Sequence, residues 1–203
     1  MNAQAQLVKF IVIGNAGVGK TSIINRLVRD DYDPEVTPTI GVDYVNFDTT
    51  VQNEPFHIII WDTAGQERYF NIIRNYFRNS LGIILVFDIT SRHSFEKIPF
   101  WLKTARKEAD PNCQVMLIGN KSDFQSIREV SNEEAEKFAE ENQILCYMET
   151  SALNNKNIKE AFMKLTEKIY NLMSTGEINI EPYNTATKVS NNDSAEETKK
   201  SCC

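Results

Sequence analysis

Long hydrophobic runs are missing from the 203-residue sequence, and cysteine is scarce. The longest apolar run covers about residues 81–87, well short of the roughly 18 residues that a transmembrane helix needs. The first six residues contain no basic region followed by an apolar stretch, and residue 2 is Asn. We therefore expect neither a secretory signal nor N-myristoylation. The sequence has only four cysteines, without a framework spacing, which indicates a reducing compartment.

Basic charge is also in short supply. Lys and Arg number 22 against 28 Asp and Glu, which gives a formal net charge of −6. A protein that binds nucleic acid through a broad basic face is therefore excluded. A local phosphate site is compatible with this charge, because backbone N–H groups bind phosphate without changing it. The length and a hydrophobic content of 41% suit one globular domain and are small for two.

Hydrophobic periodicity divides the chain into alternating strands and helices. Strand patterns occupy six segments: 7–13, 42–47, 56–61, 81–88, 115–119 and 144–148. Amphipathic patterns between them predict helices at 18–28, 95–109, after a capping box at Ser131 and Glu134, and at 158–172. Continuous apolar strands separated by helices are typical of a parallel sheet covered on both faces. Two sequence neighbours, 42–47 and 56–61, form a predicted antiparallel hairpin at the edge.

These patterns predict an α/β domain over residues 1–173. We expect a six-stranded, mostly parallel sheet with one antiparallel edge strand, flanked by about five helices. Residues 174–203 carry few large apolar side chains and many Ser, Thr, Asn and Glu. Such a composition predicts a disordered tail.

A glycine-rich loop stands between the first predicted strand and the first helix. Its sequence, Gly-Asn-Ala-Gly-Val-Gly-Lys-Thr at 14–21, fits the pattern G-x-x-x-x-G-K-[ST]. Backbone N–H groups and the helix N-terminus would hold phosphates, Lys20 would add charge, and the Thr21 hydroxyl suits Mg²⁺. An ordinary glycine-rich turn is the alternative, with a chance match on the order of one in a hundred. The expected nucleotide contacts here are Asn15, Ala16, Gly17, Val18, Gly19, Lys20, Thr21 and Ser22.

A second motif concerns the base. Asn120-Lys121-Ser122-Asp123 follows the predicted strand 115–119 at the carboxyl edge of the sheet, where ligands bind. The Asp123 carboxylate can accept hydrogen bonds from both N1–H and the 2-amino group of guanine. Adenine lacks this donor pair, so the buried charge would cost several kcal/mol with ATP. Asn120 can tie this loop to the phosphate loop, and the Lys121 stem can lie over the base. In isolation, the motif suits an exposed turn equally well.

Together the motifs resemble those of the Ras superfamily of small GTPases, over residues 7–173. The matching segments are Gly14–Thr21, Thr39, Asp62–Gln66, Asn120–Asp123 and Ser151–Leu153. Three further features resemble the Rab family: Thr39–Tyr44, Trp61–Tyr69 and the final Cys-Cys pair. The resemblance implies a P-loop NTPase G domain that binds GTP or GDP with Mg²⁺ and hydrolyses GTP.

The same resemblance implies roles for individual residues. Tyr32 would pack against guanine, and Thr39 would bind Mg²⁺ and sense the γ-phosphate. Asp62 would hold Mg²⁺ through water, while the Gly65 N–H would bind the γ-phosphate. In the turn Ser151-Ala152-Leu153, the Ala152 N–H would bind guanine O6, with Ser151 shaping the turn.

For hydrolysis, the resemblance implies that Gln66 positions the attacking water while Lys20 and Mg²⁺ neutralise charge. No arginine stands at a recognisable position to act in cis. We therefore expect slow intrinsic hydrolysis, which an activating protein accelerates by roughly 10³ to 10⁵. Ala16 stands where many small GTPases have Gly or Ser, and its methyl group approaches the γ-phosphate space. Two alternatives are a GTP-binding module without hydrolysis and a metabolic P-loop kinase, although no insertion supplies the kinase's lid.

Tyr44, Trp61 and Tyr76 match an aromatic triad that many Rab effectors contact; ordinary packing of sheet against helix is the alternative. Cys202 and Cys203 could form a disulfide or bind metal, but the resemblance favours double geranylgeranylation. The tail from residue 174 has three lysines against five acidic residues, so it offers no polybasic anchor. Stable membrane binding would then require both lipids.

The resemblance also implies a set of partners and a location. Expected partners are an exchange factor, a GTPase-activating protein, a GDP dissociation inhibitor, an escort protein with geranylgeranyl transferase, and effectors. The protein would be a monomer that cycles between the cytosol and the cytoplasmic face of an intracellular membrane. No nucleic-acid partner is expected.

Overall fold

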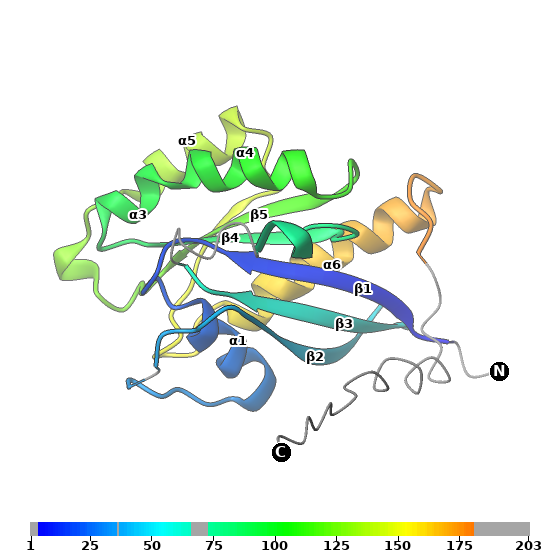
Figure 1. The fold of residues 1–203 in the computed structure, drawn as a ribbon, viewed down its shortest axis with the longest axis horizontal. Helices are drawn as coiled ribbons and strands as arrows, with labels where there is room; N and C mark the ends of the chain where they lie inside the picture. The colour runs from blue at the N-terminus through cyan, green and yellow to red at the C-terminus, as the bar shows by residue number, and fades with distance from the viewer. Residues whose placement is uncertain (1–3, 36, 66–72, 181–203) are drawn as a thin grey trace, which may run out of the picture.

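A six-stranded sheet forms the centre of the molecule in a computed structural model, which describes residues 4–35, 37–65 and 73–180 (Figure 1). The strand order is β2-β3-β1-β4-β5-β6. The strands are β1 (Gln6–Ile13), β2 (Val42–Val51), β3 (Glu54–Thr63), β4 (Gly82–Asp88), β5 (Gln114–Asn120) and β6 (Tyr147–Glu149). Only β2 is antiparallel to its neighbour, and it lies at the edge. The predicted sheet is confirmed.

Helices cover both faces of this sheet. Five α-helices occur in the described residues: α1 (Lys20–Arg29), α3 (Arg92–Glu96), α4 (Ile98–Glu108), α5 (Asn132–Glu141) and α6 (Ile158–Ser174). Two 3₁₀ turns also occur: η2 (Arg74–Tyr76) between β3 and β4, and η3 (Gln125–Ile127) between β5 and α5. Figure 1 shows α3, α4 and α5 on one face and α1 with α6 on the other. Each face therefore has its own apolar core. No helix in these described ranges is both long and apolar enough to span a bilayer.

The topology gathers the motif loops at one edge. β1 lies between β3 and β4, and chain connections leave in opposite directions from this point. Parallel strands place their carboxyl ends at the same edge, and ligands bind where the strand order reverses. The segments that follow β1, β3, β5 and β6 are 14–19, 64–65, 121–123 and 150–153. They carry many of the predicted phosphate and base residues, and the predicted metal residues Thr21 and Asp62 lie next to them, at the start of α1 and near the end of β3.

Several element boundaries differ from the predictions. The helix predicted at 95–109 divides at Lys97 into α3 and α4, with Pro99 in the first turn of α4. Proline lacks an N–H and is tolerated in that turn but not inside a helix. The first helix begins at Lys20 rather than at residue 18, because Gly19 is its N-cap with φ of 93°. The strand predicted from residue 144 begins only at Tyr147.

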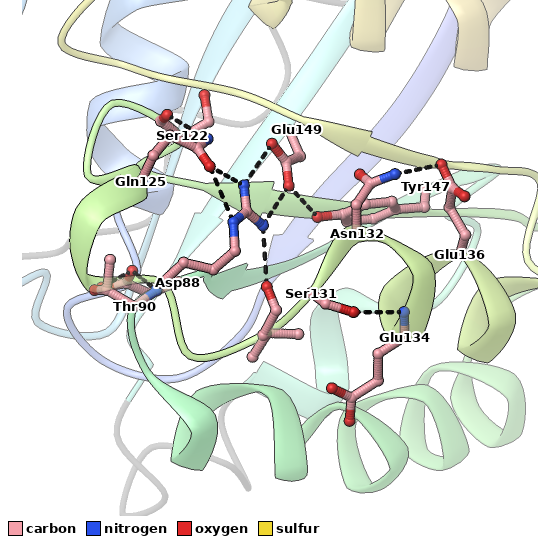
Figure 2. Close-up of polar contacts among 12 residues, drawn as sticks. Asp88, Thr90, Ser122, Gln125, Ser131, Asn132, Glu134, Glu136, Tyr147 and Glu149 are labelled. Atoms are coloured by element: carbon pink, nitrogen blue, oxygen red, sulfur yellow. Dashed lines mark hydrogen bonds and ion pairs between the residues drawn. The ribbon is translucent and has the colours of Figure 1, made fainter.

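Only one of the two hydrogen bonds of the predicted capping box forms at the start of α5. The Ser131 hydroxyl accepts a hydrogen bond from the Glu134 N–H at 3.1 Å, as Figure 2 shows. The Glu134 carboxylate, however, binds the Arg92 guanidinium from α3 instead of returning to the cap. A charge-assisted bond to a guanidinium is stronger than one to a neutral N–H. The cap thus also links α5 to α3.

Packed structure continues past residue 173, the predicted end of the domain. Helix α6 ends at Ser174, and the next turn closes with bonds from the Gly176 and Glu177 N–H groups to the last turn of α6. This turn returns Ile178 to the core, where it is 6% exposed beside Leu172. Packed residues therefore extend beyond residue 173 at least to Ile178. Cys202 and Cys203 lie outside the described residues.

Candidate nucleotide-binding site

The phosphate loop fits against the base loop through one glycine. Gly19 has a φ of 93°, and a Cβ there would lie 2.3 Å from Nδ2 of Asn120. Only glycine leaves space for this contact and adopts the conformation at low cost. The same Nδ2 donates to the Val18 carbonyl at 2.9 Å. The tie that the sequence predicted between the two loops is present.

Lys20 is 5% exposed at the floor of the loop. Its ammonium donates to the carbonyls of Gly14 and Asn15 at 2.9 and 2.8 Å. An ammonium has three donors, so one is left for a ligand. Burial lowers the pKa of Lys20 to about 8, against the opposing effect of Asp62. An anionic phosphate beside this group would favour its charged form.

Three predicted metal residues meet beside Lys20. The Thr21 hydroxyl donates to Oδ2 of Asp62 at 2.6 Å and lies 2.8 Å from the Thr39 hydroxyl. The other Asp62 oxygen, Oδ1, is buried and has no hydrogen-bond partner among the described residues. Burial raises the pKa of Asp62, while Thr21, Lys20 and Thr39 oppose this effect. Hydroxyl oxygens beside an unpartnered carboxylate oxygen fit a hard cation such as Mg²⁺.

Gly65 lies directly on the phosphate loop. A Cβ at this position would meet Ala16 N at 2.3 Å and Asn15 O at 2.4 Å, so a side chain is excluded. The preceding residue, Ala64, donates its N–H to the Gly41 carbonyl at 2.9 Å and ties β3 to the start of β2. This contact places Gly65 beside the residues expected to hold the phosphates. Gln66 lies outside the described residues.

The two base loops hold one another. The Ser151 hydroxyl donates to Oδ1 of Asp123 at 2.5 Å, and the Thr150 hydroxyl donates to Oδ1 of Asn120 at 3.1 Å. The Ser122 N–H donates to the Thr150 carbonyl at 3.0 Å. Ser151 therefore orients the carboxylate expected to read guanine, which is more than the turn-shaping predicted for it.

Behind these loops lies an arginine that the sequence analysis missed. The Arg128 guanidinium binds the Glu149 carboxylate through two bonds of 2.6 and 3.0 Å. It also donates twice to Oε1 of Gln125 and once to the Val130 carbonyl. Gln125 in turn donates to the Ser122 carbonyl at 2.8 Å, as Figure 2 shows. Burial opposes ionisation of Glu149, but hydrogen bonds from Arg128 hold its pKa below the usual value. All five guanidinium donors thus join segments that flank the base loops.

Lys121 has a partner that the sequence analysis also missed. Its backbone is in the left-handed region, with φ of 66°, and its ammonium lies 2.6 Å from Oδ2 of Asp88. Asp88 is 7% exposed, and its Oδ1 accepts bonds from the Thr90 N–H and hydroxyl (Figure 2). The end of β4 therefore anchors the Lys121 head group, which leaves the stem beside the cavity.

These groups surround a cavity of about 310 Å³. Predicted residues that line it are Ala16, Gly17, Gly19, Lys20, Thr21, Ser22, Tyr32, Thr39, Gly65 and Lys121. Asn120 ends β5, and Asn15, Val18, Asp123, Ser151, Ala152 and Leu153 lie on the adjoining loops. A buried lysine, a helix N-terminus and an oxygen-rich cluster around one cavity define a nucleotide-binding protein of the P-loop class.

The predicted aromatic triad lies together on the surface outside this cavity. The Tyr44 and Trp61 ring centroids are 5.3 Å apart, and those of Trp61 and Tyr76 are 4.6 Å apart. Tyr44 is 54% exposed, whereas Trp61 and Tyr76 pack partly against the core. Lys9 places its ammonium 5.3 Å from the Trp61 ring centroid. The cluster therefore combines the exposed Tyr44 ring with two rings that pack against the core.

Comparison with known proteins defines the family. The sequence model of the Ras family matches residues 9–171. The chain is 40% identical to Ras-related protein Rab-4 of Dictyostelium discoideum over 181 residues, 89% of this chain and 88% of that protein. It is 41% identical to human Ras-related protein Rab-4B over 86% of this chain and 82% of the relative. It is 42% identical to GTP-binding protein ypt3 of Schizosaccharomyces pombe over 83% of this chain and 78% of the relative. The chain belongs to the Ras family of small GTPases, with Rab proteins among its relatives.

Proposed function

We propose that this Rab-like GTPase is a membrane-cycling switch that recruits effectors in vesicle-mediated transport. The observation that carries the proposal is the junction of the two motif loops, where Asn120 bonds the phosphate loop while Ser151 holds Asp123. The phosphate loop thereby adjoins the loop that carries a carboxylate suited to guanine. The names of the relatives, Rab-4 and GTP-binding protein ypt3, support the same function.

Guanine recognition would depend on groups from three loops, which contain Tyr32, Asp123 and Ala152. Ser151 occupies one oxygen of Asp123 from the side, which orients the carboxylate toward the N1–H and 2-amino donors of the base. The Ala152 N–H would bind O6, and Tyr32 and the Lys121 stem would flank the ring. Because adenine would leave Asp123 unpaired, the site discriminates by an unsatisfied charge rather than by shape.

Thr21, Thr39 and Asp62 would hold Mg²⁺, with Asp62 acting through water. When bound, the ion neutralises phosphate charge. Lys20 adds a buried positive charge beside the phosphates, and the Gly65 N–H would bind the γ-phosphate. Gln66 would orient the attacking water. Phosphoryl transfer depends chiefly on such positioning and charge stabilisation.

Loss of the γ-phosphate would release the two segments that contact it, which contain Thr39 and Gly65. Partners that bind these segments in their ordered form would read the nucleotide. Tyr44, Trp61 and Tyr76 lie near both segments in the chain, and their exposed cluster supports an effector-binding role. An exchange factor and an activating protein would set the two populations, and a GDP dissociation inhibitor would extract the GDP form.

Single-turnover hydrolysis tests the enzymatic part of this proposal. The protein would be loaded with γ-labelled GTP and Mg²⁺, and the released phosphate would be followed. We expect Gln66→Leu to slow phosphate release by roughly tenfold or more while GTP remains bound. Gln114→Leu, at the opposite edge of the sheet, is the matched control and should hydrolyse GTP normally. Intact GTP on the wild-type protein would contradict hydrolysis and leave a binding module.

A further inference from the structure

An arginine on α1 binds the backbone of the loop expected to read guanine O6. The Arg26 side chain is 15% exposed. Its Nε donates to the Ala152 carbonyl at 2.9 Å, and its Nη2 donates to the Leu153 carbonyl at 3.2 Å. These acceptors lie 126 and 127 residues away in the sequence. One side chain therefore fixes two successive peptide groups of the base loop.

The same guanidinium also contacts the segment that leads to Tyr32. Nη1 donates to the Asp30 carbonyl at 2.9 Å and lies 3.3 Å from Oδ1 of Asp30. Asp30 ends α1 in the left-handed region, and its carboxylate accepts a bond from Asn155 at 2.8 Å. The guanidinium carbon lies 5.8 Å from the centroid of the Tyr32 ring. Arg26 thus contacts three segments near the expected guanine position: the end of α1 at Asp30, the Tyr32 ring, and the loop of Ala152 and Leu153.

Helix α1 connects this meeting point to the phosphate loop. Arg26 follows Lys20 by six residues, which is roughly 9 Å along a helix. Lys20 and Thr21 stand at the phosphate end of this rod, and Arg26 stands at its base end. The planar guanidinium directs its donors along fixed lines, which a lysine ammonium cannot do. The distance between phosphate cradle and base loop is therefore set through one helix and one side chain.

We propose that Arg26 is a positioning residue for guanine. It holds the Ala152 peptide, and with it the N–H expected to bind O6, in register with the phosphate loop and Tyr32. Its effect is on nucleotide residence time and on recognition of O6, not on the hydrolysis step. The inference rests on the proposed guanine site and extends it to a residue that no motif contains.

A purely structural role would be to cap α1, since Arg26 binds Asp30 at the end of its own helix. Such a cap needs no bond to Ala152 or Leu153. Asp30→Ala removes the ion pair with Arg26 and the bond from Asn155, but it keeps the bond from Arg26 to the Asp30 carbonyl and leaves both loop carbonyls in contact. Arg92→Ala removes a different bridging arginine, which joins α3 to Glu129 and Glu134 away from the cavity. The Asp30 variant therefore controls for the ion pair at the end of α1, and the Arg92 variant controls for loss of a bridging arginine.

The test measures dissociation of fluorescent GDP from full-length protein in excess Mg²⁺. Arg26→Ala should release GDP roughly tenfold or more faster, because bonds from a charged donor to the loop are lost. Arg26→Lys should also release it faster, whereas Arg92→Ala should stay near the wild-type rate and Asp30→Ala should change it less than Arg26→Ala does. Hydrolysis of bound GTP should change by less than about twofold in all variants, since Arg26 touches no reacting group. Unchanged GDP release from Arg26→Ala would overturn the proposal.

Base analogues supply a readout that simple destabilisation would not move. In 6-thio-GDP a weaker acceptor replaces O6, while IDP keeps O6 and loses the 2-amino group. Arg26→Ala should lose preference for GDP over 6-thio-GDP and keep the preference over IDP, which Asp123 reads. Equal loss of both preferences, in step with a lower Tm, would overturn the proposal. A wild-type protein without preference for GDP over IDP or ADP would instead overturn the guanine site itself.

Discussion

Among single residues, Lys20 makes the site responsive to pH. Burial lowers its pKa to about 8 in the ligand-free protein, so the amine is mostly neutral near pH 9. Bound phosphates raise that pKa, and a group whose pKa rises on binding takes up a proton in the interval between the two values. We therefore expect GDP binding near pH 9 to take up close to one proton, and less near pH 8.

Calorimetry in two buffers of different ionisation enthalpy measures this uptake. The Lys9→Gln variant is the matched control, because Lys9 also has a pKa lowered by burial but lies outside the cavity. Its proton uptake should match that of the wild-type protein. Identical heats in the two buffers at pH 9 would contradict the assignment of Lys20 to the phosphates.

Residues that act through a local motif were predictable, and residues that act at long range were not. Lys20 and Thr21 stand in one loop pattern, and Asp123 stands in another, so their types and spacing indicate their chemistry. Arg26 and Arg128 bind partners that lie 126 and 21 residues away. No periodicity connects such positions, because only the folded sheet brings their loops together.

At the scale of elements, the turn after α6 extends the packed domain. Ile178 was not predicted to be buried because it and Ile180 are two apolar residues within an otherwise polar stretch. The C-terminal turn, closed through Gly176, returns it to the core formed by α1, α6 and the sheet. Apolar runs identified the central strands, but such a return depends on chain direction after the helix.

This packing predicts different effects for two truncations. A chain that ends at residue 173 loses the burial of Ile178 and should unfold with a free energy lower by about 1.5–3 kcal/mol. A chain that ends at residue 180 keeps this contact and should match the full-length protein. Denaturant unfolding of both GDP-bound chains measures the difference. Equal midpoints and slopes for the two truncations would contradict a structural role for this turn.

Helix boundaries followed backbone chemistry that hydrophobic patterns do not contain. Phe95 of α3 continues the apolar spacing of Ile98 and Leu102 in α4, so periodicity alone favoured one continuous helix. Pro99 removes a donor and restricts the preceding residues, and the helix divides two positions earlier. Hydrophobic pattern also misplaced the start of β6. Residues 144–146 are apolar, but they precede the strand pairing that begins at Tyr147.

For the whole molecule, the acidic charge bears on membrane attachment. A tail without excess basic residues gains little from anionic lipids, so the membrane attachment that we propose would require two prenyl groups. We expect the single variants Cys202→Ser and Cys203→Ser to bind membranes weakly and reversibly, and the double variant to remain in the cytosol. Imaging of tagged full-length proteins measures this order. Membrane retention of the double variant would contradict lipid anchoring at these positions.

The net charge of −6 gives no indication that the protein binds a strongly anionic ligand. Backbone N–H groups and the Lys20 ammonium supply a local field of the opposite sign, and the oxygen cluster around Asp62 would hold the Mg²⁺ that adds to it. We propose that this field and the Asp123 loop together select a guanine nucleotide. Purified protein, denatured and analysed by chromatography, should release GDP or GTP in near-stoichiometric amount. Release of an adenine nucleotide would contradict the account.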